Sequence, residues 1–441
     1  MRRVPRALLD DLIDWLRIPS ISTGGGDPAE LEAAARWAAR HVTDAGGSAE
    51  LVRVGERPPL VVGELRAADA NAPTVLIYGH YDVQGPEPLE LWSTPPFQPA
   101  IRDGRLYARG AADDKGNFLP LLRAACEQAR DGTLAVHVRV LIEGEEETGS
   151  AACMQWLADD ERGADAAIVF DSAMVDEDTP AITIGLRGIV QLNVAVRVGE
   201  RDVHSGMYGG SVQNALLALH GMLAAVAPGP DGRLREELLE GIEPPTDAEL
   251  QSWQSLPPGE RVLQGVGARE LYPGAASEYY RRNGADASLD FNMIAGGADR
   301  TVVPALARAT LSMRLAPRQR AERIRPILER LLLAAAPAGA EVKITNHCGD
   351  PALFAPDEPA IRLAAGALES ACGVAPALVR TGGSIPIVAA LAAKDIPTVV
   401  TGFVLPDDAF HAPDESFSLR SLELGERAAH ALLQRMAELP R

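Results

Sequence analysis

Short apolar runs separated by helical segments constrain most strongly what this 441-residue chain can fold into. The runs at 74–80 (TVLIYGH), 166–170 and 397–403 have the length and the apolar character of buried strands. Segments such as 118–130, which lie between them, have the spacing of helices. Strands that alternate with helices of about ten residues are typical of a sheet with helices on both faces, so we predict an α/β fold.

The pattern changes near residue 188. Apolar and polar residues alternate at 189–198 and again at 307–315, as they do in strands that expose one face. A helical segment follows each of these strands, and a further strand is predicted at 341–346. The order strand, helix, strand, helix, strand indicates a smaller α+β domain of ferredoxin-like type.

The simplest division is therefore one α/β domain, built on a mixed sheet, that is interrupted by the smaller domain. We expect the first part of the larger domain at residues 1–187, the inserted domain at 188–348 and the second part at 349–441. We find no internal repeat and no low-complexity tract that would change this division.

The composition disfavours several classes of protein. The formal net charge is −19, which is a poor match for the phosphate backbone of nucleic acids. No apolar stretch approaches the roughly 20 residues of a membrane span, and Asp10, Asp11 and Asp14 interrupt an N-terminal segment that begins like a signal peptide. Four widely spaced cysteines without a CxxC pair fit a reducing compartment, so we expect a cytoplasmic protein.

Residue types that bind metals follow predicted strands or stand in loops at five places. These places are His80 with Asp82, Asp113 with Asp114, the run Glu145–Glu147, Asp171, and His411. In open α/β sheets, ligands gather outside the carboxyl ends of the strands. Each place alone has an ordinary explanation, such as an acidic turn or a surface pair, but together they are a strong signal. Two histidines with three carboxylates suit zinc, or less selectively manganese or cobalt, and a further glutamate could act as general base on a metal-bound water.

Eight segments, taken in order, resemble a known family. They are GHYDV, RGAADDKG, EGEEETGS, VFDS, RDVHSGMYGG, SMRLAP, GGSIP and FHAPDE, and they extend from about residue 78 to residue 415. They resemble the zinc metallopeptidase family of carnosinase, acetylornithine deacetylase and succinyl-diaminopimelate desuccinylase. The resemblance implies a hydrolase with two Zn²⁺ ions per chain, a catalytic domain, and an inserted lid or dimerisation domain that forms a homodimer.

The resemblance also implies which residues surround the two ions. One ion would be held by His80, Asp113 and Asp171, and the other by Asp113, Glu147 and His411. Asp113 would bridge the ions, because it, and not Asp114, stands three residues after the glycine of the RG pair as in the family. The peptide bond between these two aspartates would be cis.

Further roles follow from the same resemblance. Glu146 would be the general base that deprotonates the metal-bridging water, and Asp82 would orient His80. His204, in the inserted domain, matches the family's histidine that reaches across a dimer to the reaction intermediate. Arg314 matches the residue that binds the carboxylate of the substrate, for which a guanidinium group is well suited. Weaker matches to substrate-contacting positions are Thr301, Gly383 and Ser384.

Several details resemble the dipeptidase branch of the family. They are Tyr81 after the histidine, the segment WSTPPFQPAIRDGRLYARG, the Asp113–Asp114 pair and the long insert. The chain departs from this branch at Gly85, where proline is common, and in the loop after Leu405. These departures concern the choice of substrate and leave the metal site intact.

We therefore predict a zinc-dependent metallopeptidase, a dipeptidase or carboxypeptidase-like amidohydrolase that acts on a small peptide or an acyl-amino acid. One alternative is a deacylase that cleaves N-acyl amino acids at the same centre. Another is a non-catalytic binding protein on this fold, although a mere binder needs no base such as Glu146. A third, a two-metal phosphoesterase, would require more cations than Arg314 alone supplies.

Overall fold

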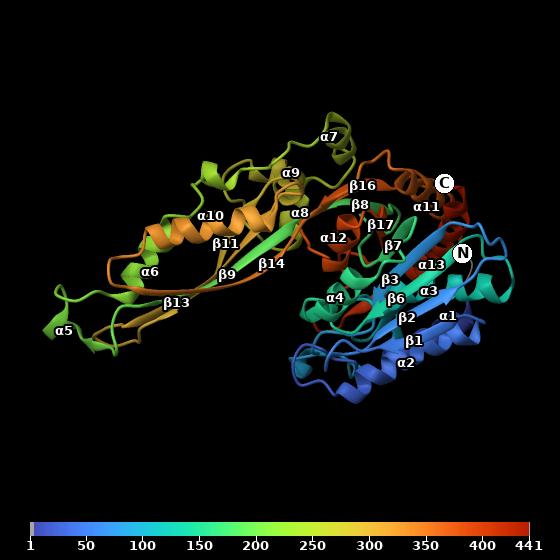
Figure 1. Cartoon of the computed structure of the whole chain (residues 1–441), viewed down its shortest axis with the longest axis horizontal. Helices are drawn as coiled ribbons and strands as arrows, with labels where there is room; N and C mark the ends of the chain where they lie inside the picture. The colour runs from blue at the N-terminus through green and yellow to red at the C-terminus, as the bar shows by residue number, and fades with distance from the viewer. Residues whose placement is uncertain (1–3, 441) are drawn as a thin grey trace. The chain divides into compact units, whose positions relative to one another are not determined.

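The computed structural model describes residues 4–440, which divide into two compact units. The first unit comprises the chain up to Ile184, the stretch Phe354–Val379 and the chain from Pro386 onward. The second comprises Gly185–Leu353 and Arg380–Ile385. In Figure 1 the first unit includes the blue and dark red ends of the chain, and the second includes most of its green-to-orange middle.

A mixed sheet forms the centre of the first unit, in the order β1-β2-β6-β3-β7-β17-β8, and the short strands β15 and β16 both pair with β8. The strands are β1 (Ser48–Val52), β2 (Leu60–Leu65), β3 (Thr74–His80), β6 (His137–Glu143), β7 (Ala166–Phe170), β8 (Ala181–Leu186), β15 (Ala352–Leu353), β16 (Ala377–Thr381) and β17 (Thr398–Thr401). β3 runs parallel to both β6 and β7, and β17 runs parallel to β7. Four neighbouring strands therefore present their carboxyl ends at the same edge of the sheet.

Helices flank this sheet, and the predicted mixed α/β class is confirmed. The helices are α1 (Arg6–Leu16), α2 (Pro28–Asp44), α3 (Lys115–Arg130), α4 (Ala151–Asp159), α11 (Pro359–Cys372), α12 (Pro386–Ala393) and α13 (Leu419–Arg435). α3 packs on β3 and β7, α13 packs on α3 and α11, and α12 packs on α4 (Figure 1). A small separate sheet, in the order β18-β5-β4, consists of β4 (Ala100–Arg102), β5 (Arg105–Tyr107) and β18 (Ser416–Ser418).

The second unit contains a four-stranded antiparallel sheet in the order β11-β13-β9-β14. Its strands are β9 (Gly188–Arg197), β11 (Ser288–Gly296), β13 (Leu306–Leu315) and β14 (Glu341–Gly349). The longer helices are α6 (Ala215–Ala224), which packs on β9 and β13, and α10 (Ala321–Ala334), which packs on β9 and β14. Leu219 and Leu328 are among the buried residues of the resulting core. The element order β-α-β-β-α-β is that of the ferredoxin-like fold, which confirms this prediction.

The sequence pattern had not revealed strand β11. From Asp290 to Gly296 every residue of this strand is exposed, and among residues 4–440 it pairs with β13 alone. A strand without a buried face has no alternating pattern of apolar residues, so periodicity does not detect it. Short elements complete the unit, namely β10 (Val203–His204), β12 (Val302–Val303), α5 (Ser205–Tyr208), α7 (Asp247–Trp253), α8 (Gly259–Gly265) and α9 (Tyr279–Gly284).

The segment Arg380–Ile385 belongs with the second unit, whereas the division made from the sequence assigned it to the last part of the larger domain. Arg380 explains this difference. Its Nε and Nη2 atoms donate to the two carboxylate oxygens of Glu249 at 2.7 and 2.8 Å, and both side chains are buried. Burial opposes ionisation of Glu249, but the hydrogen bonds from Arg380 and Thr246 outweigh it and hold its pKa below the usual value.

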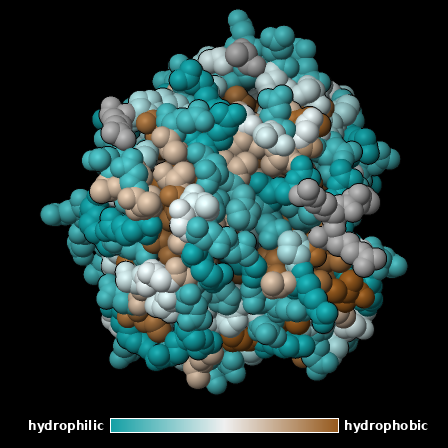
Figure 2. Space-filling model, turned by 90° about the vertical axis from the view of Figure 1, so that its right-hand side faces the viewer, coloured by the Kyte–Doolittle hydropathy of each residue, from teal (hydrophilic) through white to brown (hydrophobic). Residues whose placement is uncertain are grey.

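Polar residues dominate the outer face of the molecule shown in Figure 2, where hydrophobic residues appear in small scattered groups. This distribution agrees with the formal net charge of −19. Among residues 4–440, no helix is both long enough and apolar enough to cross a membrane.

Candidate metal centre

The carboxyl edge of the parallel strands collects the candidate ligands. His80 is the last residue of β3, and Asp171 directly follows β7. Glu146 and Glu147 lie in a short 3-10 turn just after β6, and His411 lies in the loop that follows β17. Because these four strands are parallel neighbours, segments far apart in the sequence end side by side, as the strand-end argument predicts.

Two groups of three side chains could each hold a metal ion, and they share Asp113. The first group is His80, Asp113 and Asp171, and the second is Asp113, Glu147 and His411; within each group the ligand atoms lie within 4.8 Å of one another. His80 Nε2 lies 3.0 Å from Asp113 Oδ1. His411 Nε2 lies 2.9 Å from Asp113 Oδ2 and 3.1 Å from Glu147 Oε2.

Asp113 and Asp114 have different surroundings although they are adjacent. The Asp113 carboxylate lies between the two histidines, whereas Asp114 is buried and its Oδ2 accepts a bond from the backbone N–H of His80 at 3.2 Å. The peptide bond between the two aspartates is cis, as the family resemblance implied. Asp113 is therefore the residue whose geometry allows a bridge between two ions.

The three adjacent glutamates also separate into different environments. Glu145 is buried, pairs with Arg57 at 3.0 Å and accepts a hydrogen bond from the backbone of Ala152 at the start of α4. Glu147 faces His411. Burial raises the pKa of Glu146, and the nearby carboxylates of the cluster add to this effect. Glu145 thus supports the local fold, which leaves Glu146 and Glu147 for the site.

The electrostatics of this cluster suit a cation. Burial raises the pKa of Asp171 to about 8, and the neighbouring carboxylates reinforce the shift. Hydrogen bonds to Asp113 and Glu147 raise the pKa of His411 to about 10. Burial opposes ionisation of Asp113, but the hydrogen bonds from His411 and His80 outweigh it and keep its pKa low. Buried carboxylates this close together need positive charge beside them, which protons or divalent ions can supply.

In the described part of the chain, three buried carboxylate oxygens lack a hydrogen-bond partner, on Asp114, Glu143 and Glu147, and of these residues only Glu147 belongs to a ligand group. Among residues 4–440, Glu147 Oε1 has no hydrogen-bond partner, while Gln84 Nε2 donates to Oε2 of the same carboxylate at 2.9 Å. A buried carboxylate oxygen without a donor is costly unless a cation lies against it. The imidazole and carboxylate donors therefore fit zinc, manganese or cobalt.

Asp82 connects the segment of His80 with the segment of Glu146 and Glu147. It lies 3.4 Å from His80 Nδ1, and its two oxygens accept bonds from the backbone N–H groups of Glu146 and Glu147, each at 3.2 Å. Ser22 Oγ donates to Asp82 Oδ2 at 2.6 Å. The sequence pattern had revealed neither Ser22 nor Gln84. Gln84 stands beside the GHYDV motif, but Ser22 lies 60 residues away and carries no local signal.

The residues matched to substrate binding all belong to the second unit, where they form two groups. Arg314, on β13, donates from Nη1 to Ser384 Oγ at 3.1 Å, and Gly383 precedes Ser384. His204, on β10, pairs with Val302 on β12, and the next residue donates its N–H to the carbonyl of Thr301 at 3.0 Å. The structure thus places Arg314 with Ser384, and His204 with Thr301.

Arg187 lies near Arg314 and was not singled out from the sequence. It is buried, Ser384 Oγ donates to its carbonyl at 2.6 Å, and its Nε has no hydrogen-bond partner among the described residues. Burial, followed by the charge of Arg314, lowers the pKa of Arg187 to about 10. Two guanidinium groups close together are a suitable environment for an anion.

A comparison with known protein families decides the classification. The model of peptidase family M20/M25/M40 matches residues 76–435, which is most of the chain. The chain belongs to this family. The predicted relationship to zinc metallopeptidases of the carnosinase type is therefore confirmed at the level of the family.

Individual relatives of this M20 peptidase agree with the predicted branch. A Beta-Ala-His dipeptidase of Homo sapiens is 26% identical over 400 residues, covering 87% of this chain and 78% of the relative. A cysteinylglycine-S-conjugate dipeptidase of Corynebacterium striatum is 27% identical over 401 residues, covering 89% and 87%. An M20 family metallo-carboxypeptidase from Sulfolobus solfataricus has the same fold, with a TM-score of 0.90, 24% identity and coverage of 98% and 100%. Both sequence relatives are dipeptidases, which confirms the resemblance to the dipeptidase branch.

A third group of possible ligands in this M20 peptidase, Glu127, Glu426 and His430, has a different explanation. Gln128 accepts a hydrogen bond from Gln434 on its oxygen, so its Nε2 faces His430 Nδ1 at 3.1 Å. His430 Nδ1 is then an acceptor, and the proton of the neutral ring lies on Nε2, 3.5 Å from Glu127. Both ring nitrogens of this histidine thus face protein groups, Gln128 on one side and Glu127 on the other, so we assign no ion to this group.

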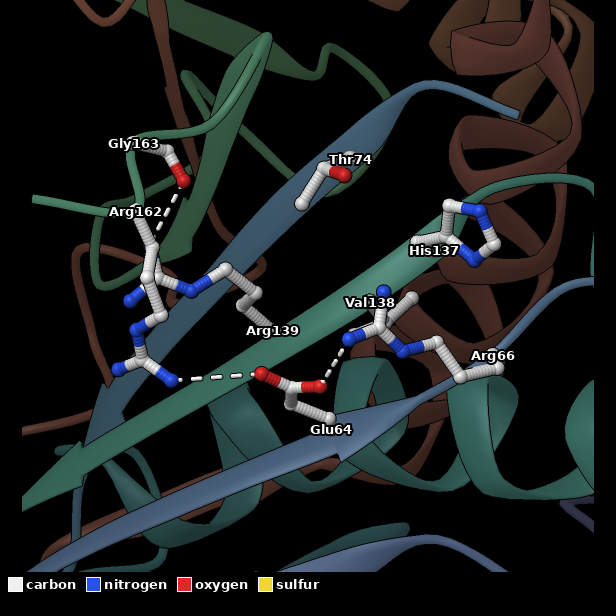
Figure 3. A pocket seen from close by; sticks show the side chains of 8 residues that line it. All are labelled: Glu64, Arg66, Thr74, His137, Val138, Arg139, Arg162 and Gly163. Atoms are coloured by element: carbon white, nitrogen blue, oxygen red, sulfur yellow. Dashed lines mark hydrogen bonds and ion pairs between the residues drawn. The ribbon is translucent and has the colours of Figure 1, made fainter. Parts of the chain in front are cut away.

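A polar cavity of about 160 Å³ lies at the opposite, amino-terminal end of β3 and β6 (Figure 3). Arg66 and Arg162 both bond to Glu64, and Arg139 bonds to the carbonyl of Gly163. Because each of these three guanidinium groups has a protein partner, we assign no ligand to this cavity.

We predict that His411→Ala removes one metal ion and leaves the other. His411 belongs to one group of ligands only, so the group of His80, Asp113 and Asp171 stays complete. Metal analysis after dialysis against zinc should find about one ion per chain instead of about two. His347→Ala, at an exposed histidine of β14, is the control and should keep both ions. Equal metal content in the parent and the His411 variant would contradict the assignment.

Proposed function

We propose that this chain is a metal-dependent dipeptidase, which hydrolyses the amide bond of dipeptides or short peptides with two divalent ions, preferably zinc. The observation that carries the proposal is the pair of ligand groups that share Asp113, found in a member of a peptidase family. The names of the relatives support dipeptides as the substrate class. Both groups include the Asp113 carboxylate, which could therefore serve two ions at once.

The residues have separate tasks in this reaction. When bound, two such ions polarise the carbonyl of the substrate and lower the pKa of water. Glu146 would accept a proton from the attacking water on its carboxylate and pass it to the leaving amine. Asp82 would hold the backbone of Glu146 and Glu147 through its two hydrogen bonds at 3.2 Å, and so keep the base in place.

We expect Glu146→Ala to retain both ions but to lower kcat by about 10²–10⁴-fold, because it removes the proton acceptor alone. Metal analysis and single-turnover kinetics with a dipeptide would measure the two effects. Glu161→Ala, at an exposed glutamate of the same unit, should leave both unchanged. If the Glu146 variant turns over peptide at the parent rate, the base is wrongly assigned.

The carboxylate of the substrate would bind at Arg314, supported by Ser384, Gly383 and the neighbouring Arg187. The support for this role is the half-buried guanidinium of Arg314, whose Nη1 donates to Ser384 at 3.1 Å, and the second guanidinium beside it. A planar fork of donors matches a carboxylate in shape and charge. The same group would also hold the carboxylate of an N-acyl amino acid, so a deacylase is the second candidate.

A panel of substrates separates these two candidates. We expect free-amine dipeptides to be hydrolysed in preference to N-acetyl and N-succinyl amino acids, and to be preferred over their C-terminal amides. Arg314→Met should lower kcat/KM for the free carboxylate by about 10–100-fold and abolish the preference over the amide. Arg308→Met, six residues earlier on the same strand and exposed, is the matched control. Faster turnover of the N-acyl substrates would establish the deacylase instead.

We further infer that the chain forms a homodimer in which His204 of one subunit serves the site of the other. Edge strand β11 exposes Phe291, Met293 and Ile294, an apolar edge that favours association between copies. His204 is exposed, and its Nδ1 accepts the N–H of Gly206 at 3.1 Å. A neutral His204 therefore carries its proton on Nε2, where it could donate to a developing oxyanion.

Mixed dimers provide the test. His204→Ala and Glu146→Ala should each be inactive as homodimers. In a mixed dimer, the chain with His204→Ala keeps its own Glu146 and receives His204 from the chain with Glu146→Ala, so one of the two sites is complete. Equal mixing should restore about a quarter of the parent rate, since half of the dimers are mixed and each has one complete site. No recovery in proven mixed dimers would contradict action across the dimer, and a monomer in sedimentation would contradict the dimer itself.

We also infer a cytoplasmic location. All four cysteines are free, and Cys126 and Cys153 are buried, as expected where thiols stay reduced.

A further inference from the structure

Glu415 connects the two segments that supply Asp113 and His411. It lies four residues after His411, directly before β18, and its side chain is fully buried. Its Oε2 accepts bonds from Arg109 Nη1 at 2.6 Å and from the N–H of Gly110 at 2.9 Å. Its Oε1 accepts bonds from the N–H groups of Ala112 at 2.8 Å and of Asp113 at 3.0 Å. One carboxylate thus accepts four hydrogen bonds, all from residues within the short segment 109–113.

These bonds determine the path of the backbone that carries Asp113. Gly110 has a φ of 83°, a value that favours glycine, and the turn there directs three N–H groups toward Glu415. The backbone of Glu415 also participates, because its carbonyl accepts the N–H of Ala108 at 3.1 Å. The pairing of β18 with β5 stops at Tyr107. Beyond Ala108, the backbone N–H groups of Gly110, Ala112 and Asp113 donate to the side chain of Glu415 instead of to a neighbouring strand.

Arg109 compensates the buried charge of Glu415. Its guanidinium is also buried, donates to the carbonyl of Gly85 at 3.3 Å and lies over the ring of Trp92 at 5.3 Å. A buried carboxylate is tolerated when it is paired and fully hydrogen-bonded. The Glu415 carboxylate is therefore fully hydrogen-bonded next to the backbone of Asp113, and the positive charge of Arg109 balances its negative charge.

We propose that Glu415 is a positioning residue, which holds the Asp113 carboxylate between His80 and His411 before any metal binds. The inference rests on the proposed metal centre. The four hydrogen bonds of the Glu415 carboxylate go to Arg109 and to backbone N–H groups, so it acts on the site through the backbone of Asp113. Because the same residue belongs to the His411 segment, it fixes the spacing between a shared ligand and a ligand of the second group.

Glu415→Gln tests this role with little change in volume. Glutamine keeps one acceptor oxygen, and its NH₂ group must face two of the four donors, so two bonds are lost and two donors are opposed. We expect the metal affinity, measured by competition with a chelator, to fall by about 10–100-fold, as it does when groups behind metal ligands are changed. With saturating metal, kcat should fall while KM for the dipeptide changes by less than about twofold.

Asp160→Asn is the matched control for loss of a buried ion pair in the same unit. Asp160 accepts a bond from Arg139 at 2.6 Å, both side chains are largely buried, and Arg139 lines the cavity at the other end of the sheet. This variant should keep the parent metal affinity and kcat. Equal loss of affinity in both variants would overturn the proposal, as would parent-like affinity in folded Glu415→Gln.

Hydrogen exchange of the unaltered protein tests the proposal without a variant, and therefore also applies if Glu415→Gln does not fold. The amides of Gly110, Ala112 and Asp113 should be protected in the metal-free protein and gain little more protection with zinc. Rapid exchange that slows only when zinc is added would show that the metal orders this loop, and would overturn the proposal. Failure of the proposed function is distinct, because the parent protein itself would then bind no ions and cleave no peptide.

Discussion

The contact of one carboxylate with two histidines is the interaction on which the candidate site depends. Asp113 lies 3.0 Å from His80 and 2.9 Å from His411, and these three residues come from three separate segments of the chain. Without Asp113 in this place, the two groups of ligands would have no residue in common, and a site for two metals would lack its bridging ligand. The parallel strands, the turn at Gly110 and the loop of His411 all contribute to placing this one side chain.

Placing several acids together costs free energy, and the structure shows how the cost is limited. Burial raises the pKa of Asp171 to about 8, so the cluster is not fully ionised at neutral pH without a cation. The acids around it are satisfied by other means. Glu145 is paired with Arg57, Glu415 with Arg109, and Asp82 with backbone N–H groups and Ser22. Glu147 Oε1, which belongs to one of the two ligand groups, is left without a hydrogen-bond partner among the described residues, as expected for a site that exchanges protons for divalent ions.

The second unit contributes a different chemistry. It carries Arg314 on β13 and Arg187 between β8 and β9. Ser384 of the Arg380–Ile385 segment accepts a bond from the guanidinium group of Arg314 and donates one to the backbone carbonyl of Arg187. In the proposed function, the guanidinium groups for the substrate and the carboxylates for the metals would thus belong to separate folding units. A peptide substrate offers both a carbonyl and a carboxylate, so a dipeptidase needs both kinds of group.

The sequence by itself determined the fold class, the ferredoxin-like insert and the identity of the seven residues expected at the metal centre. Apolar periodicity is a local property, and polar residues after parallel strands meet at one edge whatever the details of packing. The family resemblance had separated the roles of the adjacent acids, and the tertiary structure added their contacts, such as the pairing of Glu145 with Arg57 and of Asp114 with the backbone of His80. The tertiary structure also revealed Ser22, Gln84 and Glu415, the exposed strand β11, and the place of the Arg380–Ile385 segment. These features depend on contacts between residues as much as about 300 positions apart, which packing establishes and no local pattern encodes.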